Sequence, residues 1–364
     1  MSDRLGKAAA SSQSRAISPF GLLAAAATRL RSLLALVIIL VVFSRLTPVY
    51  LTWPNLVIMT QHVSVTALLA TGMTFVILTA GIDLSVGSIA GLSGVVAGYL
   101  IDQGLPLGGH AVFLPAAVII MIAIVLGAAI GAINGVLIAV IRIPAFIATL
   151  GMLYVARGAA LLIAGGASFI NLSGSPAKGN VGFDYVGNAR WFNLPVMIYI
   201  MVIIGIIGAV VARRTVFGKH VYAVGGNERA AVSAGIRVTM VKIAVYALSG
   251  TCAGIGGVLL AAQLSAADPT AGTNYELGAI AAVVLGGTSL FGGQGTVAGS
   301  IAGAFVIGFL NDGLVLSNVS EFWQMVATGL VIIAAVGIDE FQRVGSTKLQ
   351  ARKRLRLKSQ APGQ

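Results

Sequence analysis

Residues 218–242 read GKHVYAVGGNERAAVSAGIRVTMVK and separate two long apolar runs, 196–211 and 243–263. Apolar runs of about 20 residues are long enough to cross a bilayer as helices. Six basic residues lie in or just before the polar segment: Arg213, Arg214, Lys219, Arg229, Arg237 and Lys242. Basic loops stay on the cytoplasmic side of a membrane, so we expect a cytoplasmic loop at about 213–242.

The same loop has the pattern of a short capped helix over residues 229–234. Asn227 is a favourable N-cap and Glu228 suits the positive first turn of a helix. Gly235 is a natural residue just past the end, and two glycines ahead of the cap give a flexible entry. A helix presented between two spans suits contact with a soluble partner. The residues expected to act in this contact are Gly225, Gly226, Asn227, Glu228, Ala230, Ala231 and Gly235.

The composition predicts an all-α polytopic membrane protein with about ten transmembrane helices. Of the 364 residues, 57% are hydrophobic and 9% are charged, and the 47 glycines suit close packing of membrane helices. The candidate spans are 33–48, 58–79, 86–101, 112–141, 145–164, 195–212, 243–263, 277–290, 297–316 and 322–338.

The basic residues define the expected domain organisation. Residues 1–32 and 339–364 form basic tails around a transmembrane domain at 33–338, and an even number of spans places both tails in the cytoplasm. A glycine-rich loop at about 165–193, without a hydrophobic periodicity of its own, then lies on the periplasmic side. The net charge of +12 follows this pattern, so we expect contact with lipid and none with nucleic acid.

The sequence shows weak internal repetition. Residues 77–91, ILTAGIDLSVGSIAG, resemble 284–299, VLGGTSLFGGQGTVAG, and GAINGVL at 131–137 resembles GFLNDGLV at 308–315. The shared order of these blocks favours a duplication, a recurring plan in transporters. The alternative is that glycine-rich apolar sequence aligns easily with itself.

No catalytic constellation is visible in the sequence. It has no phosphate-binding GxxxxGK[ST] loop, and its three histidines lack the spacing of a metal site. The single Cys252 excludes an intramolecular disulfide. We therefore expect no catalytic residue, no metal and no cofactor on this chain, and energy that comes from another subunit or an ion gradient.

Four polar residues within the apolar segments are candidates for the pathway or its gating. Asp83, followed by Ser85, lies where carboxylates are expensive, yet it also suits capping of the helix that follows. Asn134 and Asn311 occupy matching places in the two repeats, where amides either link helices or line a polar route.

Other charged residues have simpler interpretations. Arg157 lies within a span, and we expect it to extend its charged end toward the interface or to pair with a buried acid. Asp268, Asn274 and Glu276 are expected in a solvated outer loop.

Four stretches together resemble the permease subunit of ribose-type carbohydrate ABC importers, over about residues 50–340. They are TGMTFVILTAGIDLSVGSIAGLSG (71–94), GAINGVLIAVIRIPAFIATLGMLYVARGAALLIAGG (131–166), GKHVYAVGGNERAAVSAGIRV (218–238) and GAIAAVVLGGTSLFGGQGTVAGSIAGAFVIGFLNDGL (278–314). The outer segment VGFDYVGNARWFNLPVMIY (181–199) is a looser match.

The resemblance implies a bacterial inner-membrane permease that imports a monosaccharide or a related small polar solute. It implies three partners: a second permease copy, a periplasmic sugar-binding protein and a cytoplasmic ABC ATPase that holds ATP and Mg²⁺. We expect the second permease copy to be identical, so that the two form a homodimer. The segment GGNERAAVSAGI then resembles the coupling helix that docks on the ATPase.

Two other classes of function stay open from the residues alone. An ion-coupled secondary transporter that uses Asp83 predicts uptake that collapses with an uncoupler and needs no ATPase. A membrane-embedded enzyme is disfavoured because no catalytic group is visible.

Overall fold

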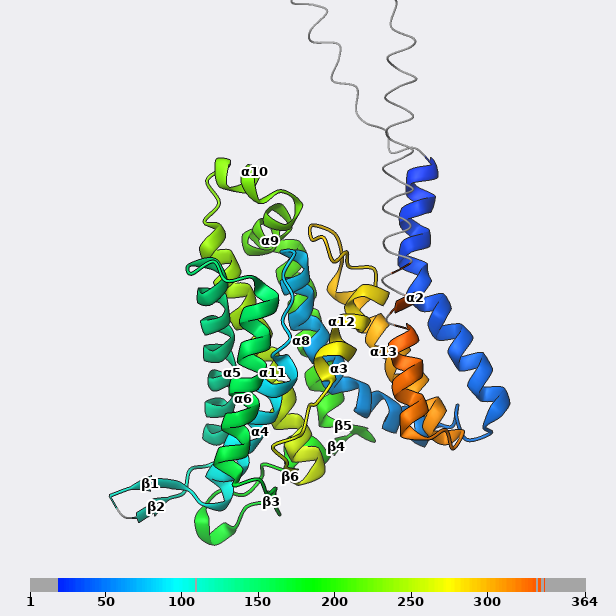
Figure 1. The fold of residues 1–364 in the computed structure, drawn as a ribbon. Helices are drawn as coiled ribbons and strands as arrows, with labels where there is room; N and C mark the ends of the chain where they lie inside the picture. Colours follow the sequence, from blue (N-terminus) through cyan, green and yellow to red (C-terminus); the bar gives the residue numbers. More distant parts are fainter. Residues whose placement is uncertain (1–18, 109, 332, 335–336, 338–364) are drawn as a thin grey trace, which may run out of the picture.

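The computed structural model describes residues 19–337 apart from 109, 332, 335 and 336, and it shows a helical bundle (Figure 1). In order, the main helices are α2 (Pro19–Leu46), α3 (Trp53–Leu78), α4 (Val86–Asp102), α5 (Ala116–Ala139), α6 (Ala145–Ala164), α8 (Val196–Arg214), α11 (Val238–Leu264), α12 (Tyr275–Leu285) and α13 (Val297–Leu316). Shorter helices are η2 (Pro176–Lys178), α7 (Tyr185–Asn188), α9 (Val216–Gly226) and α10 (Glu228–Ser233).

The prediction of an all-α polytopic membrane protein is confirmed. Six helices of the described chain, α3, α5, α6, α8, α11 and α13, are long and apolar enough to cross a membrane. Three further apolar helices are shorter, namely residues 32–46 of α2, α4 and α12. Nine of the ten predicted spans therefore contain a helix. The tenth, 322–338, is helical over 321–331, and its end lies outside the described residues.

Helices α5 and α11 cross closely through glycines. A methyl group built at Gly127 would lie 2.5 Å from Gly250 O, and one at Gly135 would lie 2.5 Å from Ile243 Cα. One at Gly131, between them, would overlap Tyr246 O. Glycines four residues apart share one helix face, so they let two backbones touch without a hydrophobic drive between helices.

Helix α12 is a half-length helix because an extended segment precedes it inside the bundle. After α11, β6 (Ala266–Ala267) pairs with β3 (Phe169–Ile170), and the chain then turns back along α4. A methyl group built at Gly98 would lie 2.6 Å from Ala267 Cβ, and one at Gly91 would lie 2.7 Å from Ala271 O. Non-helical backbone at membrane depth requires such protein cover.

The predicted outer loop at 165–193 is an ordered cap rather than a plain loop. It contains β3, η2, α7 and β4 (Arg190–Trp191), and β4 pairs with β5 (Leu194–Pro195). Leu172 and Phe183 are fully buried against the ends of the bundle, although the segment has no periodicity to reveal them. The hairpin of β1 (Leu105–Leu107) and β2 (His110–Val112) projects from the same end (Figure 1).

The outward faces of several long helices are apolar. Val202, Ile203, Ile206, Ile207 and Val210 of α8 are exposed, as are Phe146, Tyr154, Val155 and Leu162 of α6. Large apolar faces without a protein partner suit contact with lipid.

Candidate functional site

Helices α9 and α10 lie at the end of the bundle opposite the strands (Figure 1). The predicted short helix exists, at Glu228–Ser233, and Asn227 caps it: its side-chain oxygen accepts a hydrogen bond from Ala230 N at 3.0 Å. Gly235, just past the end, has φ +81°, which glycine adopts without strain. These local predictions are confirmed.

Three contacts fix α10 onto its neighbours. Both oxygens of Glu228 accept hydrogen bonds from Lys242 Nζ of α11 at 2.9 Å. Ala231 is 4% exposed, and its carbonyl accepts a hydrogen bond from Ile236 N at 3.0 Å. A helix of six residues does not hold by itself in water, so these contacts keep it ordered.

The solvent-facing side of α10 differs from the predicted set of contact residues. Ala230 and Val232 are exposed, whereas Ala231 faces the protein. Gly225 and Gly226 were expected to give a flexible entry, and that expectation is wrong because both belong to helix α9.

Gly225 has a packing role that the sequence did not reveal. A methyl group there would overlap Leu78 O at the end of α3 and would lie 2.6 Å from Gly293 N. Gly293 N itself donates to Leu78 O at 2.9 Å. The end of α9 therefore contacts the last residue of α3, just before the connection 79–85 to α4, and also the connection 286–296 between α12 and α13.

Tyr222 strengthens this junction from α9. Its hydroxyl donates to Gly295 O at 2.8 Å, and partial burial raises the pKa of the phenol although nearby Arg213 opposes the rise. A cleft of about 500 Å³ lies beside the junction, beneath α10. Its lining includes Gly81, Arg142, Glu228, Lys242 and Tyr246.

The structure brings together three of the four predicted pathway residues. Asp83 Oδ1 accepts hydrogen bonds from Ser85 N at 3.0 Å and Ser85 Oγ at 2.6 Å, and Asp83 Oδ2 accepts one from Ser249 Oγ at 2.9 Å. Asn134 Nδ2 donates to Ser85 Oγ at 2.8 Å. Asp83, Ser85, Asn134 and Ser249 are all buried. Their hydrogen bonds link the start of α4 to α5 and α11.

Two details of these predictions differ from the structure. Helix α4 begins at Val86 and has Ser85 at its N-cap, so Asp83 binds the turn before the helix instead of capping it directly. Asn311 lies on α13, where its Oδ1 accepts a hydrogen bond from Thr328 Oγ1 at 3.2 Å. In the repeat, residues 79–85 before α4 correspond to residues 286–296 before α13. Asn311 lies on the first helix after its segment, whereas Asn134 lies on α5, the second helix after its segment. The two asparagines therefore do not occupy equivalent places.

Arg157 has partners that the sequence could not name. Its Nη1 donates to Pro269 O at 2.5 Å and Ala271 O at 2.8 Å, and so it holds the extended segment before α12. Glu276 is only 8% exposed, at the start of α12, which corrects its expected solvated position. The reason is that 266–274 returns into the bundle, a long-range feature without a local signal.

Within the described chain no group of three or more His, Cys, Asp or Glu side chains is arranged to hold a metal ion. The arrangement is one of hydrogen-bonded links and close glycine contacts between helices.

Comparisons with known proteins agree on one family. A family model described as the permease component of branched-chain amino acid transport systems matches residues 55–336. The ribose import permease protein RbsC of Escherichia coli (strain K12) is 44% identical over 309 residues, which are 85% of this chain and 92% of that protein.

Other relatives have the same kind of name. The ribose import permease protein RbsC of Bacillus subtilis (strain 168) is 41% identical over 319 residues, 85% of this chain and 92% of its own length. The D-allose transport system permease protein AlsC of Escherichia coli (strain K12) is 38% identical over 307 residues, with 84% and 89% covered. No solved structure matched the chain.

The bundle of apolar helices and these matches define a multi-pass membrane permease, a transport subunit. Within that class, the chain belongs to the family of ribose-type ABC sugar importer permeases.

Proposed function

We propose that this chain forms the transmembrane route of an ATP-driven importer for a monosaccharide or a related small polar solute. A second copy of the chain encloses the route, a periplasmic binding protein delivers the sugar, and a separate cytoplasmic ATPase supplies the energy with ATP and Mg²⁺. The protein lies in the bacterial inner membrane with both termini in the cytoplasm. The names of the relatives, which transport ribose, allose and xylose, support the substrate class.

Helix α10 is the element that docks on the ATPase, and the observation that carries this proposal is its construction. It is capped by Asn227, anchored by the Glu228–Lys242 ion pair, and exposes Ala230 and Val232. Small exposed side chains permit close approach of a partner. Behind it, the contact of Gly225 with Leu78 gives a push on α9 a direct route to the connection between α3 and α4.

The test compares substitutions on α10 with a matched substitution on a lipid-facing helix. Val232→Trp and Glu228→Arg are expected to abolish sugar uptake, because the first blocks the exposed face and the second breaks the ion pair and repels Lys242. Val202→Trp, also at an exposed valine but on α8, is expected to leave uptake near its normal rate.

Uptake of labelled D-ribose in cells and the amount of protein in the membrane are measured for each variant. The proposal is wrong if both α10 variants transport normally. It is also wrong if labelling in intact cells places α10 on the exterior of the membrane.

A further inference from the structure

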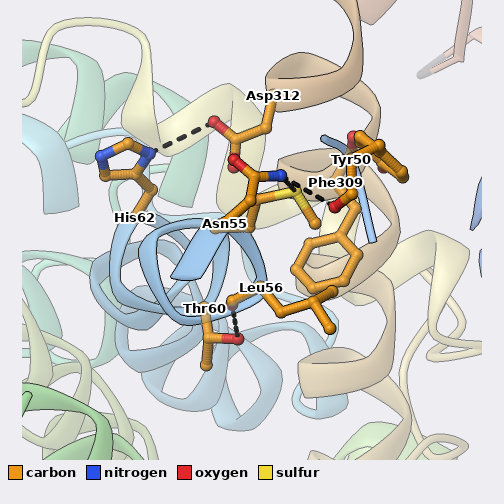
Figure 2. A network of polar contacts seen from close by, with 8 residues as sticks. Tyr50, Asn55, Leu56, Thr60, His62, Phe309 and Asp312 are labelled. Atoms are coloured by element: carbon orange, nitrogen blue, oxygen red, sulfur yellow. Dashed lines mark hydrogen bonds and ion pairs between the residues drawn. The ribbon is translucent and has the colours of Figure 1, made fainter. Parts of the chain in front are cut away.

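A histidine and an aspartate meet between α3 and α13, near the end of the bundle opposite α10. His62 Nδ1 and Asp312 Oδ1 are 3.2 Å apart (Figure 2). The sequence pattern did not single out either residue, because His62 has no metal-ligand spacing and Asp312 follows Asn311 in the repeat block.

The neighbouring polar groups already have partners. Tyr50 Oη donates to Phe309 O at 2.7 Å, and Asn55 Nδ2 donates to Tyr50 O at 2.9 Å (Figure 2). Asp312 Oδ2 is buried and has no hydrogen-bond partner among the residues that the structure describes. That oxygen has almost no accessible surface, so a solute reaches the pair through the more exposed side chain of His62.

The pair is also exposed where lipid contact is unfavourable. The side chain of His62 is 52% exposed and that of Asp312 is 19% exposed. His62 is nine residues into α3, about 13 Å along the helix axis. Among the residues whose exposure the structure describes, no other Asp, Glu, Lys, Arg or His side chain is exposed so far from the end of a long apolar helix.

Charged groups that face lipid are costly and are therefore rare on the outward faces of membrane helices. The exposed faces of α6 and α8 are apolar and avoid this cost. The face of α3 with His62 therefore lies against water or against polar groups. Thr66, one turn further along α3, continues this polar face towards Gly278 of α12, where an added methyl group would lie 4.0 Å from Thr66 Cγ2.

We propose that the His62–Asp312 pair lines the sugar route and binds hydroxyl groups of the passing sugar. The proposal rests on the proposed function and adds a contact point to it. The ring nitrogen of His62 that faces away from Asp312 exchanges a hydrogen bond with a sugar hydroxyl, and Asp312 Oδ1 holds the imidazole ring in place. Because the aspartate is already paired with histidine, the site suits an uncharged polyol better than a cation.

The first test asks whether the pair faces water, and it uses the buried natural cysteine. Cys252 is 2% exposed and packs against Gly72, so it gives little background with a membrane-impermeant thiol reagent. His62→Cys is expected to react with that reagent in membranes, and Val202→Cys on the apolar face of α8 is expected not to react. Absence of reaction at residue 62 would place this face against lipid or a second copy and would overturn the proposal.

The second test measures D-ribose uptake per folded protein in the membrane. Asp312→Asn and His62→Gln are expected to lower uptake about fivefold, the loss that follows from removing one hydrogen bond of about 1 kcal/mol. Asp102→Asn and His110→Gln make the same chemical changes at exposed positions at or beyond the end of α4 and are expected to change uptake less than twofold.

Equal uptake in all four variants would overturn the proposal. So would a fall in uptake that only follows a loss of folded protein. The outcome is separable from the proposed coupling role of α10, because Val232→Trp is expected to stop uptake while His62→Cys in the same chain still reacts with the reagent.

Discussion

The two connections at the α10 end, 79–85 between α3 and α4 and 286–296 between α12 and α13, have related sequences and are held in different ways. The first is closed by a buried carboxyl group: Asp83 accepts hydrogen bonds from Ser85 and Ser249. The second has no ionisable residue and is built on glycine backbone, with Gly292 and Gly293 at φ +82° and +72°.

Two segments with related sequences are therefore held in place by different interactions. The hydrogen bond between Asp83 and Ser249 ties the first connection to α11. The second connection is held by close backbone contact with Gly225 and by the hydrogen bond to Leu78 O. A side chain added in the second connection acts by steric overlap, whereas a side chain changed in the first acts by loss of hydrogen bonds.

The largest effect is expected from Asp83→Leu in the first connection. The substitution removes the acceptor of three hydrogen bonds and leaves the buried hydroxyls of Ser85 and Ser249 without it. We expect a loss of about 3–5 kcal/mol of stability, measured by thermal unfolding in detergent. Asp83→Asn keeps one acceptor and is expected to lose less; equal losses for the two variants would contradict the role given to these hydrogen bonds.

A smaller effect is expected from Gly292→Ala in the second connection. The residue has φ +82°, and the added methyl group would lie 2.9 Å from Ala80 N. We expect a loss of about 1–2 kcal/mol from the left-handed backbone alone, together with slower uptake. Gly226→Ala is the control, because it lies in helix α9 with open space around it and is expected to stabilise slightly. An identical response at the two glycines would refute the steric account.

The smallest effect is expected from Thr288→Val, also in the second connection. Its hydroxyl lies 3.4 Å from Ser300 Oγ, a long contact, and the side chain is fully buried. Replacement by a side chain of the same shape is expected to cost at most about 1 kcal/mol, measured by the same unfolding assay. A loss as large as that of Asp83→Leu would show that the second connection also depends on hydrogen bonds.

Local signals in the sequence predicted local structure well. The apolar runs gave the helices, and the order of Asn227, Glu228 and Gly235 predicted the short helix α10, because capping depends on neighbouring residues alone. The polar residues Asp83, Ser85 and Asn134 lie together in the structure, since polar side chains within apolar segments need partners, and their role in the pathway or its gating stays a prediction.

Features that depend on distant parts of the chain were missed. The contact of Gly225 with Leu78 joins residues 147 positions apart, and no pattern in either segment reveals it. The return of 266–274 into the bundle placed Glu276 inside, although the sequence there resembles an ordinary loop. The His62–Asp312 pair was missed for the same reason, since the two residues are 250 positions apart.

The six-residue length of α10 bears on how a complex assembles. A segment so short does not stay helical in a chain that is still being inserted, because its order depends on Lys242 and on the burial of Ala231. The surface that α10 presents thus forms only after α9 and α11 have docked. Under the proposed function, the ATPase that docks on this surface would bind folded permeases and not immature ones.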